Sequence, residues 1–141
     1  MIDLARLKLT LMSQLGKPYL YGAKWKLDDP DPKGQVDCSG FVRWAFAQVG
    51  VPIPDGSEAQ YETSIPVSPA NFPDVGFFKN GSQPCHHVGI LLDDKIVIEA
   101  RGDPFNKIIL RPRSKWEAWH EFTGWRSFKA VEEAHAPLGV L

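Results

Sequence analysis

The chain has 141 residues and a mass of 15.8 kDa, which is the size of one ordinary domain with its own hydrophobic core. Hydrophobic residues make up 43% and charged residues 23%, which is close to average globular usage and excludes a disordered or membrane-embedded class. The 16 basic and 17 acidic side chains give a net charge of −1, which removes the whole-molecule electrostatic argument for binding nucleic acid or an anionic membrane.

Helices are predicted in the first half of the chain. Leucines at steps of three and four residues predict an amphipathic helix over residues 4–15. Residues 19–36 show no period and are predicted to form a loop. A second helix is expected to begin after Asp37, its N-cap, and to end at Gly50, and a short third helix is expected over residues 57–63.

The second half of the chain shows a period of two residues, which is typical of strands. Five short strands are predicted: Val75–Phe78, His86–Leu92, Ile96–Ala100, Lys107–Pro112 and Glu121–Phe128. Helices first and strands second predict an α+β domain with an antiparallel sheet. We expect one domain over residues 1–128, followed by a C-terminal tail, residues 129–141, that forms a short helix or frays.

The chain has two cysteines, Cys38 and Cys85, which are too few for a disulfide scaffold or a four-cysteine zinc site. One disulfide, two free thiols or one reactive thiol are the alternatives. Cys38 is predicted just inside the start of the second helix, where unpaired backbone N–H groups and the helix dipole favour the thiolate. This position suits a nucleophile, and the alternative is a small buried side chain that happens to start a helix.

A nucleophilic cysteine needs a histidine that takes its proton, and this partner is usually distant in sequence. Of the four histidines, His120 and His135 are interpreted as surface or packing residues. His86 and His87 begin a predicted strand. Alternation puts them on opposite faces, so only one of them is expected to share a pocket with Cys38.

The turn after this strand decides whether Glu99 can orient the histidine. A three-residue turn at residues 93–95 places Glu99 on the same sheet face as His87, close enough to accept its other ring proton. A two-residue turn would place Glu99 on the other face. The alternative role of Glu99 is that of a solvated strand residue.

Two motifs in this order carry a resemblance to a known family. Residues 37–42, DCSGFV, begin a helix, and residues 87–90, HVGI, begin 49 residues after the cysteine. Three further segments agree with the same pattern: residues 16–22 (GKPYLYG), 57–60 (SEAQ) and 74–78 (DVGFF). Together they resemble the NlpC-type family of bacterial cell-wall cysteine peptidases over about residues 10–128.

This resemblance implies a papain-like fold and a role for several residues. Cys38 would be the nucleophile and His87 the general base and then acid. Glu99 would be the third residue of the triad, where the family most often has His, Asn or Gln. Tyr21 would help to bind the reacting carbonyl oxygen beside the backbone N–H of Cys38.

The resemblance also implies a substrate class. It points to hydrolysis of peptidoglycan stem peptides through a thioester, at a bond after a D-amino acid such as that from γ-D-glutamate to a diamino acid. Asp37 and Ser39 are similar to family residues that line the substrate site, and helix capping is the alternative role of Asp37. Ala23 replaces the second glycine of the family's usual pair, and the loop over residues 25–34 is longer than typical. No metal or organic cofactor is implied.

Other signals have simpler interpretations. Cys38, Cys85, His86 and His87 lack the paired spacings of a zinc site, and Cys85 is interpreted as a bystander thiol. Residues 101–129 carry seven basic and three acidic side chains, a local excess of +4, which either attracts an anionic cell wall or forms a solvated sheet face. Three tryptophans either stack on sugar rings or pack against the sheet: Trp116, Trp119 and Trp125.

The expected partner is bacterial peptidoglycan, with no nucleic acid, no membrane span and an open oligomeric state. The N-terminus lacks the pattern of a secretory signal, so synthesis in the cytoplasm and another route to the wall are expected. A bacteriolytic phage lysin, a tail-associated hydrolase or a secreted antibacterial effector would fit. The rival interpretations are a papain-like amidase or acyltransferase on another acyl substrate, and a catalytically silent wall-binding module.

Overall fold

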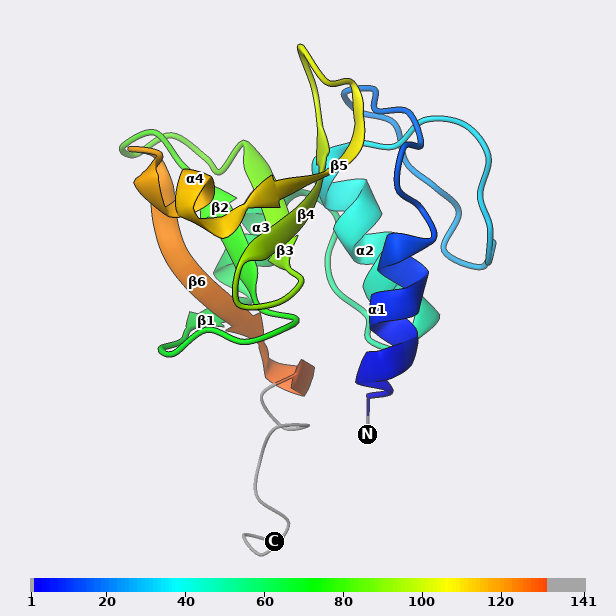
Figure 1. The fold of residues 1–141 in the computed structure, drawn as a ribbon, viewed down its shortest axis with the longest axis horizontal. Coiled ribbons are helices and arrows are strands. Elements are labelled where there is room, and N and C mark those ends of the chain that lie inside the picture. The colour runs from blue at the N-terminus through cyan, green and yellow to red at the C-terminus, as the bar shows by residue number, and fades with distance from the viewer. Residues whose placement is uncertain (1, 132–141) are drawn as a thin grey trace, which may run out of the picture.

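The structure is a computed structural model, and it describes residues 2–131 of the chain. The helices are α1 (Leu4–Met12), α2 (Cys38–Gln48), α3 (Ser57–Glu62) and α4 (Arg113–Ala118). The strands are β1 (Ser64–Pro66), β2 (Val75–Phe78), β3 (His87–Leu91), β4 (Ile96–Arg101), β5 (Lys107–Pro112) and β6 (Phe122–Phe128). Figure 1 shows α1 and α2 side by side next to the sheet, so the predicted α+β class with an antiparallel sheet is confirmed.

The predicted elements are all present, but α1 is shorter than expected. It ends at Met12, with Ser13 as its C-cap, and Leu15 is not part of its buried face, which is made by Leu7 and Leu11. The sequence patterns missed β1 and α4, which have only three and six residues. Such short elements contain too few apolar positions to establish a period.

Of the predicted C-terminal tail, residues 129–131 are helical and Val131 is buried. Residues 132–141, which include His135, lie outside the described residues. None of the helices within residues 2–131 is long and apolar enough to cross a membrane.

The sheet has six strands in the order β1-β6-β2-β3-β4-β5, and every neighbouring pair is antiparallel. One face packs on α1 and α2 through the main hydrophobic core. The other face carries a second apolar cluster around Trp116 and Trp125. Because both faces are covered, the side chains of β2 and β3 are buried along their whole length.

The hairpin of β3 and β4 has the three-residue turn that the sequence argument required. Ile90 pairs with Ile98, and the N–H of Leu92 donates to the carbonyl oxygen of Ile96 at 2.8 Å, which leaves residues 93–95 as the turn. Continuing this register puts Glu99 opposite the residue two places after His87. Their side chains therefore lie on the same sheet face.

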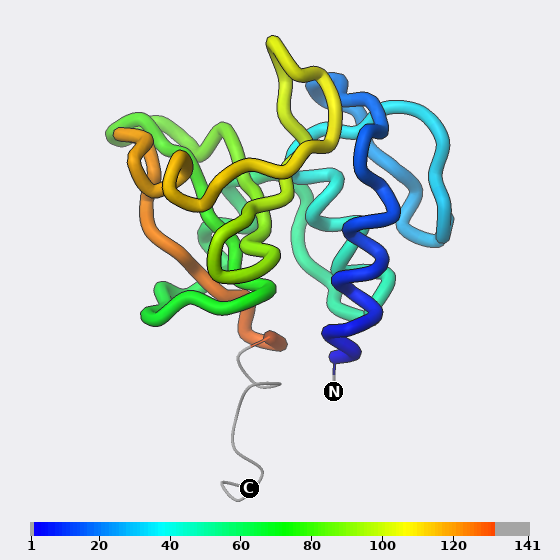
Figure 2. The backbone as a smooth tube through the Cα atoms, viewed as in Figure 1, coloured from blue at the N-terminus to red at the C-terminus, as the bar shows by residue number. Residues whose placement is uncertain are grey.

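Two loops close the end of the molecule at which α2 begins. Figure 2 shows the loop after β4 (yellow) and the long loop before α2 (blue to cyan) at that end. They are joined by the backbone, because Pro18 bridges to Lys107 and the N–H of Tyr19 donates to the carbonyl oxygen of Asn106. This contact fixes Tyr19 next to the start of α2.

Candidate active site

Cys38 is the first residue of α2, and it is 8% exposed. Asp37 caps this helix as predicted, because its Oδ1 accepts a hydrogen bond of 2.7 Å from the Gly40 N–H. A Cβ atom on Gly40 would lie 2.7 Å from that same oxygen, so this form of the cap requires glycine. The thiol thus lies at a helix N-terminus, where the dipole favours a negative charge.

His87 and Glu99 form a buried pair beside this cysteine. Nε2 of His87 lies 2.6 Å from Oε1 of Glu99, and the two residues are 9% and 0% exposed. The side chain of His87 also interacts with that of Cys38. The structure therefore brings together the three residues that the sequence nominated from three different segments.

The charges of this pair stabilise each other. Burial lowers the pKa of His87, but hydrogen bonds and charge interactions with Cys38 and Glu99 outweigh burial and raise that pKa to about 9. Burial raises the pKa of Glu99, whereas hydrogen bonds from His87 and Trp116 lower it, and the net result is a pKa below the ordinary value. An imidazolium and a carboxylate are therefore the favoured forms at neutral pH.

Three N–H donors hold the carboxylate of Glu99. Besides His87, Nη1 of Arg101 donates to Oε1 at 3.0 Å, and Nε1 of Trp116 donates to Oε2 at 2.8 Å. Trp116 comes from α4, so the sequence patterns could not place this donor. A Cβ atom on Gly89 would lie 2.7 Å from the Trp116 ring, and glycine in β3 therefore makes room for it.

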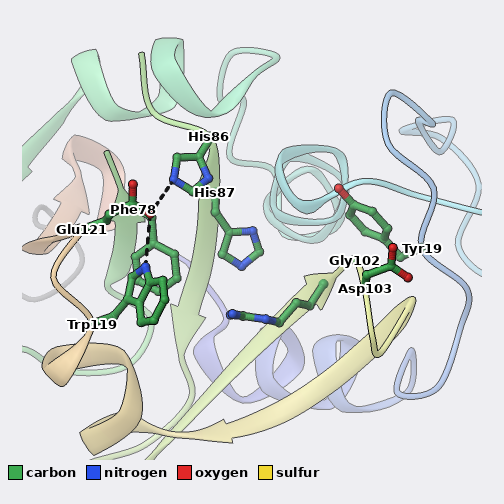
Figure 3. Close-up of a pocket in the computed structure, with 9 residues that line it drawn as sticks. Tyr19, Phe78, His86, His87, Gly102, Asp103, Trp119 and Glu121 are labelled. Atoms are coloured by element: carbon green, nitrogen blue, oxygen red, sulfur yellow. Dashed lines mark hydrogen bonds and ion pairs between the residues drawn. The ribbon is translucent and has the colours of Figure 1, made fainter. Parts of the chain in front are cut away.

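Two grooves adjoin Cys38 and His87. The larger, with a volume of about 440 Å³, is lined by Cys38 and reaches towards the loop before α2. The smaller, with a volume of about 230 Å³, is lined by His87 and is shown in Figure 3. Tyr19 and His86 line both grooves, so the two grooves meet at these two residues.

His86 shares the larger groove with Cys38. Only one of the two histidines was expected to share a pocket with Cys38, and the larger groove is lined by His86, whose carbonyl oxygen lies 4.0 Å from Sγ of Cys38, and not by His87. His86 precedes β3 and so does not follow the alternation of that strand. Its Nε2 lies 3.1 Å from Oε1 of Glu121, and Figure 3 shows the rings of His86 and His87 pointing in different directions.

The two tyrosines before α2 occupy different positions. Tyr21, the residue nominated from the sequence, lines the larger groove but is 87% exposed. Tyr19 is partly buried, and burial and the nearby side chains of Cys38 and Asp37 raise its pKa. The sequence offered two tyrosines two residues apart, and the backbone contacts of Tyr19 with Val36 and Asn106 distinguish the one held beside the thiol.

Asp37 and Ser39 line the larger groove, but both already have a cationic partner. Nζ of Lys24 lies 2.7 Å from Oδ2 of Asp37, 3.1 Å from Oγ of Ser39 and, in addition, 3.1 Å from Oδ1 of Asp55. Lys24 also lines the groove and was not nominated from the sequence. A ligand at this wall would meet a lysine–carboxylate cluster.

The segment at residues 57–60 holds the site from behind. The amide of the fully buried Gln60 donates to the carbonyl oxygen of Ser39 at 3.1 Å, and the hydroxyl of Ser57 donates to that of Cys85 at 2.8 Å. The carboxylate of Glu58 accepts from the N–H of Cys85 at 2.6 Å. This short helix therefore ties the start of α2 to the chain just before His87.

Both cysteines are free thiols, so the disulfide alternative is excluded in this structure. Cys85 is buried, and burial first and the charge of Glu58 second raise its pKa to about 11. No group of three or more His, Cys, Asp and Glu side chains within residues 2–131 could hold a metal ion.

Of the three tryptophans considered for sugar stacking, Trp116 and Trp125 are buried, and Trp119 is about half exposed in the smaller groove.

Comparison with known proteins supports the fold and the family. The family model described as the NlpC/P60 family matches residues 16–122. The chain is 35% identical over 111 residues to the peptidoglycan endopeptidase RipB of Mycobacterium tuberculosis, which covers 73% of this chain and 45% of RipB. It is 38% identical over 89 residues to the probable endopeptidase p60 of Listeria grayi, which covers 62% of this chain and 16% of that protein. The chain thus spans less than half the length of either relative.

Solved structures agree. The structure of the M. tuberculosis peptidoglycan hydrolase RipB matches with a TM-score of 0.69 and 30% identity, over 88% of this chain and 63% of that one. The P60 domain of the M. avium subspecies paratuberculosis antigen MAP1204 matches with a TM-score of 0.71 and 29% identity, over 89% and 93%. The predicted papain-like fold is therefore confirmed.

Proposed function

The chain belongs to the NlpC/P60 family, and on this basis we propose that it is a cysteine endopeptidase that hydrolyses peptidoglycan stem peptides. The observation that carries the proposal is the buried His87–Glu99 pair at 2.6 Å, next to a thiol at the N-terminus of α2. A nucleophile, a base within reach and a group that orients the base are the elements of thiol hydrolysis.

The first step is the formation of an ion pair. Because Nε2 of His87 is hydrogen-bonded to Glu99, Nδ1 is the ring nitrogen that remains to take the proton of the Cys38 thiol. The raised pKa of His87 favours an imidazolium, and the positive end of the α2 dipole lies at the thiol. The His87–Glu99 pair would therefore rest in its charged form beside the thiol of Cys38.

Hydrolysis then proceeds through a thioester. Sγ of Cys38 attacks the carbonyl carbon, and the C–N bond breaks as the imidazolium of His87 gives its proton to the departing amine. Water that loses a proton to His87 then attacks the thioester and releases the acid and the thiol. The backbone N–H of Cys38 and the hydroxyl of Tyr19 would stabilise the oxyanion, whereas the exposed Tyr21, with Asp37 and Ser39, would contact substrate in the larger groove.

The test is digestion of purified peptidoglycan followed by mass spectrometry of the muropeptides. Wild-type protein should produce new stem-peptide fragments, and the matched Cys38→Ser variant, which keeps the size of the side chain, should produce none. An unchanged muropeptide profile with wild-type protein would sink the peptidase proposal. Reaction of Cys38 with other acyl substrates would then favour an amidase or acyltransferase.

The route by which this domain reaches the wall is a separate proposal from the sequence: phage lysis, virion association or a specialised secretion system. Its test is the genomic neighbourhood. A neighbouring holin or tail gene would support a phage function, and an adjacent immunity gene would support an antibacterial effector. The absence of both would count against this proposal without affecting the proposed chemistry.

A further inference from the structure

The smaller groove lies on the side of the site from which the leaving amine must depart. The departing nitrogen takes its proton from His87, so the leaving group has to lie against that ring. Within residues 2–131, His87 lines the smaller groove and Cys38 lines the larger one. This assigns the acyl part of the substrate to the larger groove and the leaving group to the smaller.

The two carboxylates that line the smaller groove already have hydrogen-bond partners within the protein. Figure 3 shows Trp119 and Glu121 on one side and Tyr19, Gly102 and Asp103 on the other. The carboxylate of Glu121 accepts from Nε1 of Trp119 at 3.2 Å and lies 3.1 Å from Nε2 of His86. The carboxylate of Asp103 accepts from Nδ2 of Asn106 at 2.9 Å. Both acidic side chains therefore have partners within the protein.

Unlike these carboxylates, the guanidinium of Arg101 has few hydrogen-bond partners within residues 2–131. It is the one Lys or Arg that lines this groove, and its side chain is 27% exposed. Nη1 donates to Glu99, and no other hydrogen bond of the guanidinium is made to residues 2–131. A guanidinium has five N–H donors in a planar fork that matches a carboxylate, so most of its donors remain available to a ligand in the groove.

We propose that the smaller groove binds leaving groups that carry a free carboxylate, with Arg101 as the residue that recognises it. The inference rests on the proposed peptidase function, because it names the leaving group of that reaction. A carboxylate on Arg101 would form a charge-assisted pair that is partly shielded from water, whereas a carboxamide would not. Arg101 is thus a specificity-determining residue, and amidation of the leaving residue would weaken turnover.

The test compares two soluble stem peptides that differ in one group. Both are L-Ala-γ-D-Glu-L-Lys, one with a C-terminal carboxylate and the other with a C-terminal carboxamide. We expect wild-type protein to prefer the carboxylate by about tenfold in kcat/KM, which corresponds to one charge-assisted hydrogen bond. Arg101→Met should remove the preference, and Arg101→Lys should keep part of it.

Arg111 offers a matched control. Its guanidinium lies 5.0 Å from the centre of the Phe105 ring, and that of Arg101 lies 6.0 Å from the same centre, but Arg111 does not line the groove. Arg111→Met should therefore keep the wild-type preference. Arg101 also contacts Glu99, so its replacement is expected to lower kcat for both peptides, and the ratio between the two peptides is the readout that separates recognition from positioning. An unchanged ratio in Arg101→Met, or no preference in the wild type, would overturn the inference.

A binding measurement separates this inference from the proposed function. L-lysine and L-lysinamide serve as fragments of the two leaving groups, and NMR titration of the Cys38→Ser variant measures their dissociation constants without turnover. We expect L-lysine to bind about tenfold tighter, and Arg101→Met in the same background to equalise the two. If the wild type cuts neither peptide but this preference is present, the peptidase proposal fails and the carboxylate site stands. If the enzyme cuts both peptides equally and binds both fragments equally, the peptidase proposal stands and the carboxylate site fails.

Discussion

The Glu99→Gln substitution tests the electrostatics of the site most directly. The carboxylate of Glu99 is fully buried and accepts from His87, Arg101 and Trp116. Glutamine keeps the size of the side chain and one acceptor oxygen, but its NH₂ group must face at least one N–H donor. The substitution therefore removes the negative charge next to the imidazole and leaves a buried donor unsatisfied.

The size of the effect follows from the pKa of His87. Its value of about 9 lies above the ordinary 6.5, and at about 1.4 kcal/mol per unit the difference corresponds to about 3 kcal/mol. The hydrogen bonds and charges of both Cys38 and Glu99 produce this shift against the effect of burial, so the carboxylate of Glu99 accounts for part of it. Because the pKa is raised on folding, this stability is fully present below pH 6.5 and is lost as the pH rises through 9.

The assay is the pH dependence of kcat/KM on a soluble stem peptide. The basic limb reports loss of the imidazolium proton, and we expect it near pH 9 in the wild type and more than one unit lower in Glu99→Gln. Turnover should fall less than in His87→Ala, since equal losses would mean that the carboxylate does more than orient the ring. If activity is too low, NMR titration of the His87 ring gives the same pKa. An unchanged basic limb would refute the argument.

Three further outcomes are expected. Cys38 should react with iodoacetamide at pH 6 at least about tenfold faster than Cys85, whose pKa is raised to about 11 by burial, and equal labelling by peptide mass spectrometry would count heavily against catalysis. Tyr19→Phe should lower kcat by about tenfold or more, as expected for one oxyanion donor, and Tyr21→Phe by less than about twofold; the opposite order would restore Tyr21 as the donor. Gly89→Ala should lower the free energy of unfolding by about 1–3 kcal/mol in urea, because the new Cβ would lie 2.7 Å from an indole ring, and an unchanged midpoint would contradict the packing.

The features that the sequence predicted well depend on local rules. Asp37 as the N-cap of α2 follows from residue type and the position of the apolar face. The approach of Glu99 to His87 follows from the parity of one turn, and the structure has the three-residue turn that this requires. In both cases a few neighbouring residues contain the whole of the information.

The features that the sequence did not predict depend on contacts between distant segments. Tyr19 lies beside the thiol because its backbone pairs with Val36 and Asn106, and no local period reveals such bridges. Trp116 belongs to a six-residue helix that is held by packing. Alternation along the strand did not reveal that His86 lines the groove of Cys38, because His86 precedes β3.

These distant contacts also explain why a charged acid can remain in the core. A buried carboxylate is costly unless its oxygens accept hydrogen bonds from well-placed donors. Glu99 obtains one donor from β3, one from its own strand and one from α4, so its ionised state depends on the packing of the outer face of the sheet. Trp116 contributes to both the packing and the charge, since its ring lies in the second apolar cluster and its N–H donates to the carboxylate of Glu99. A substitution in that cluster should therefore change the proton affinity of His87 as well as the stability of the fold.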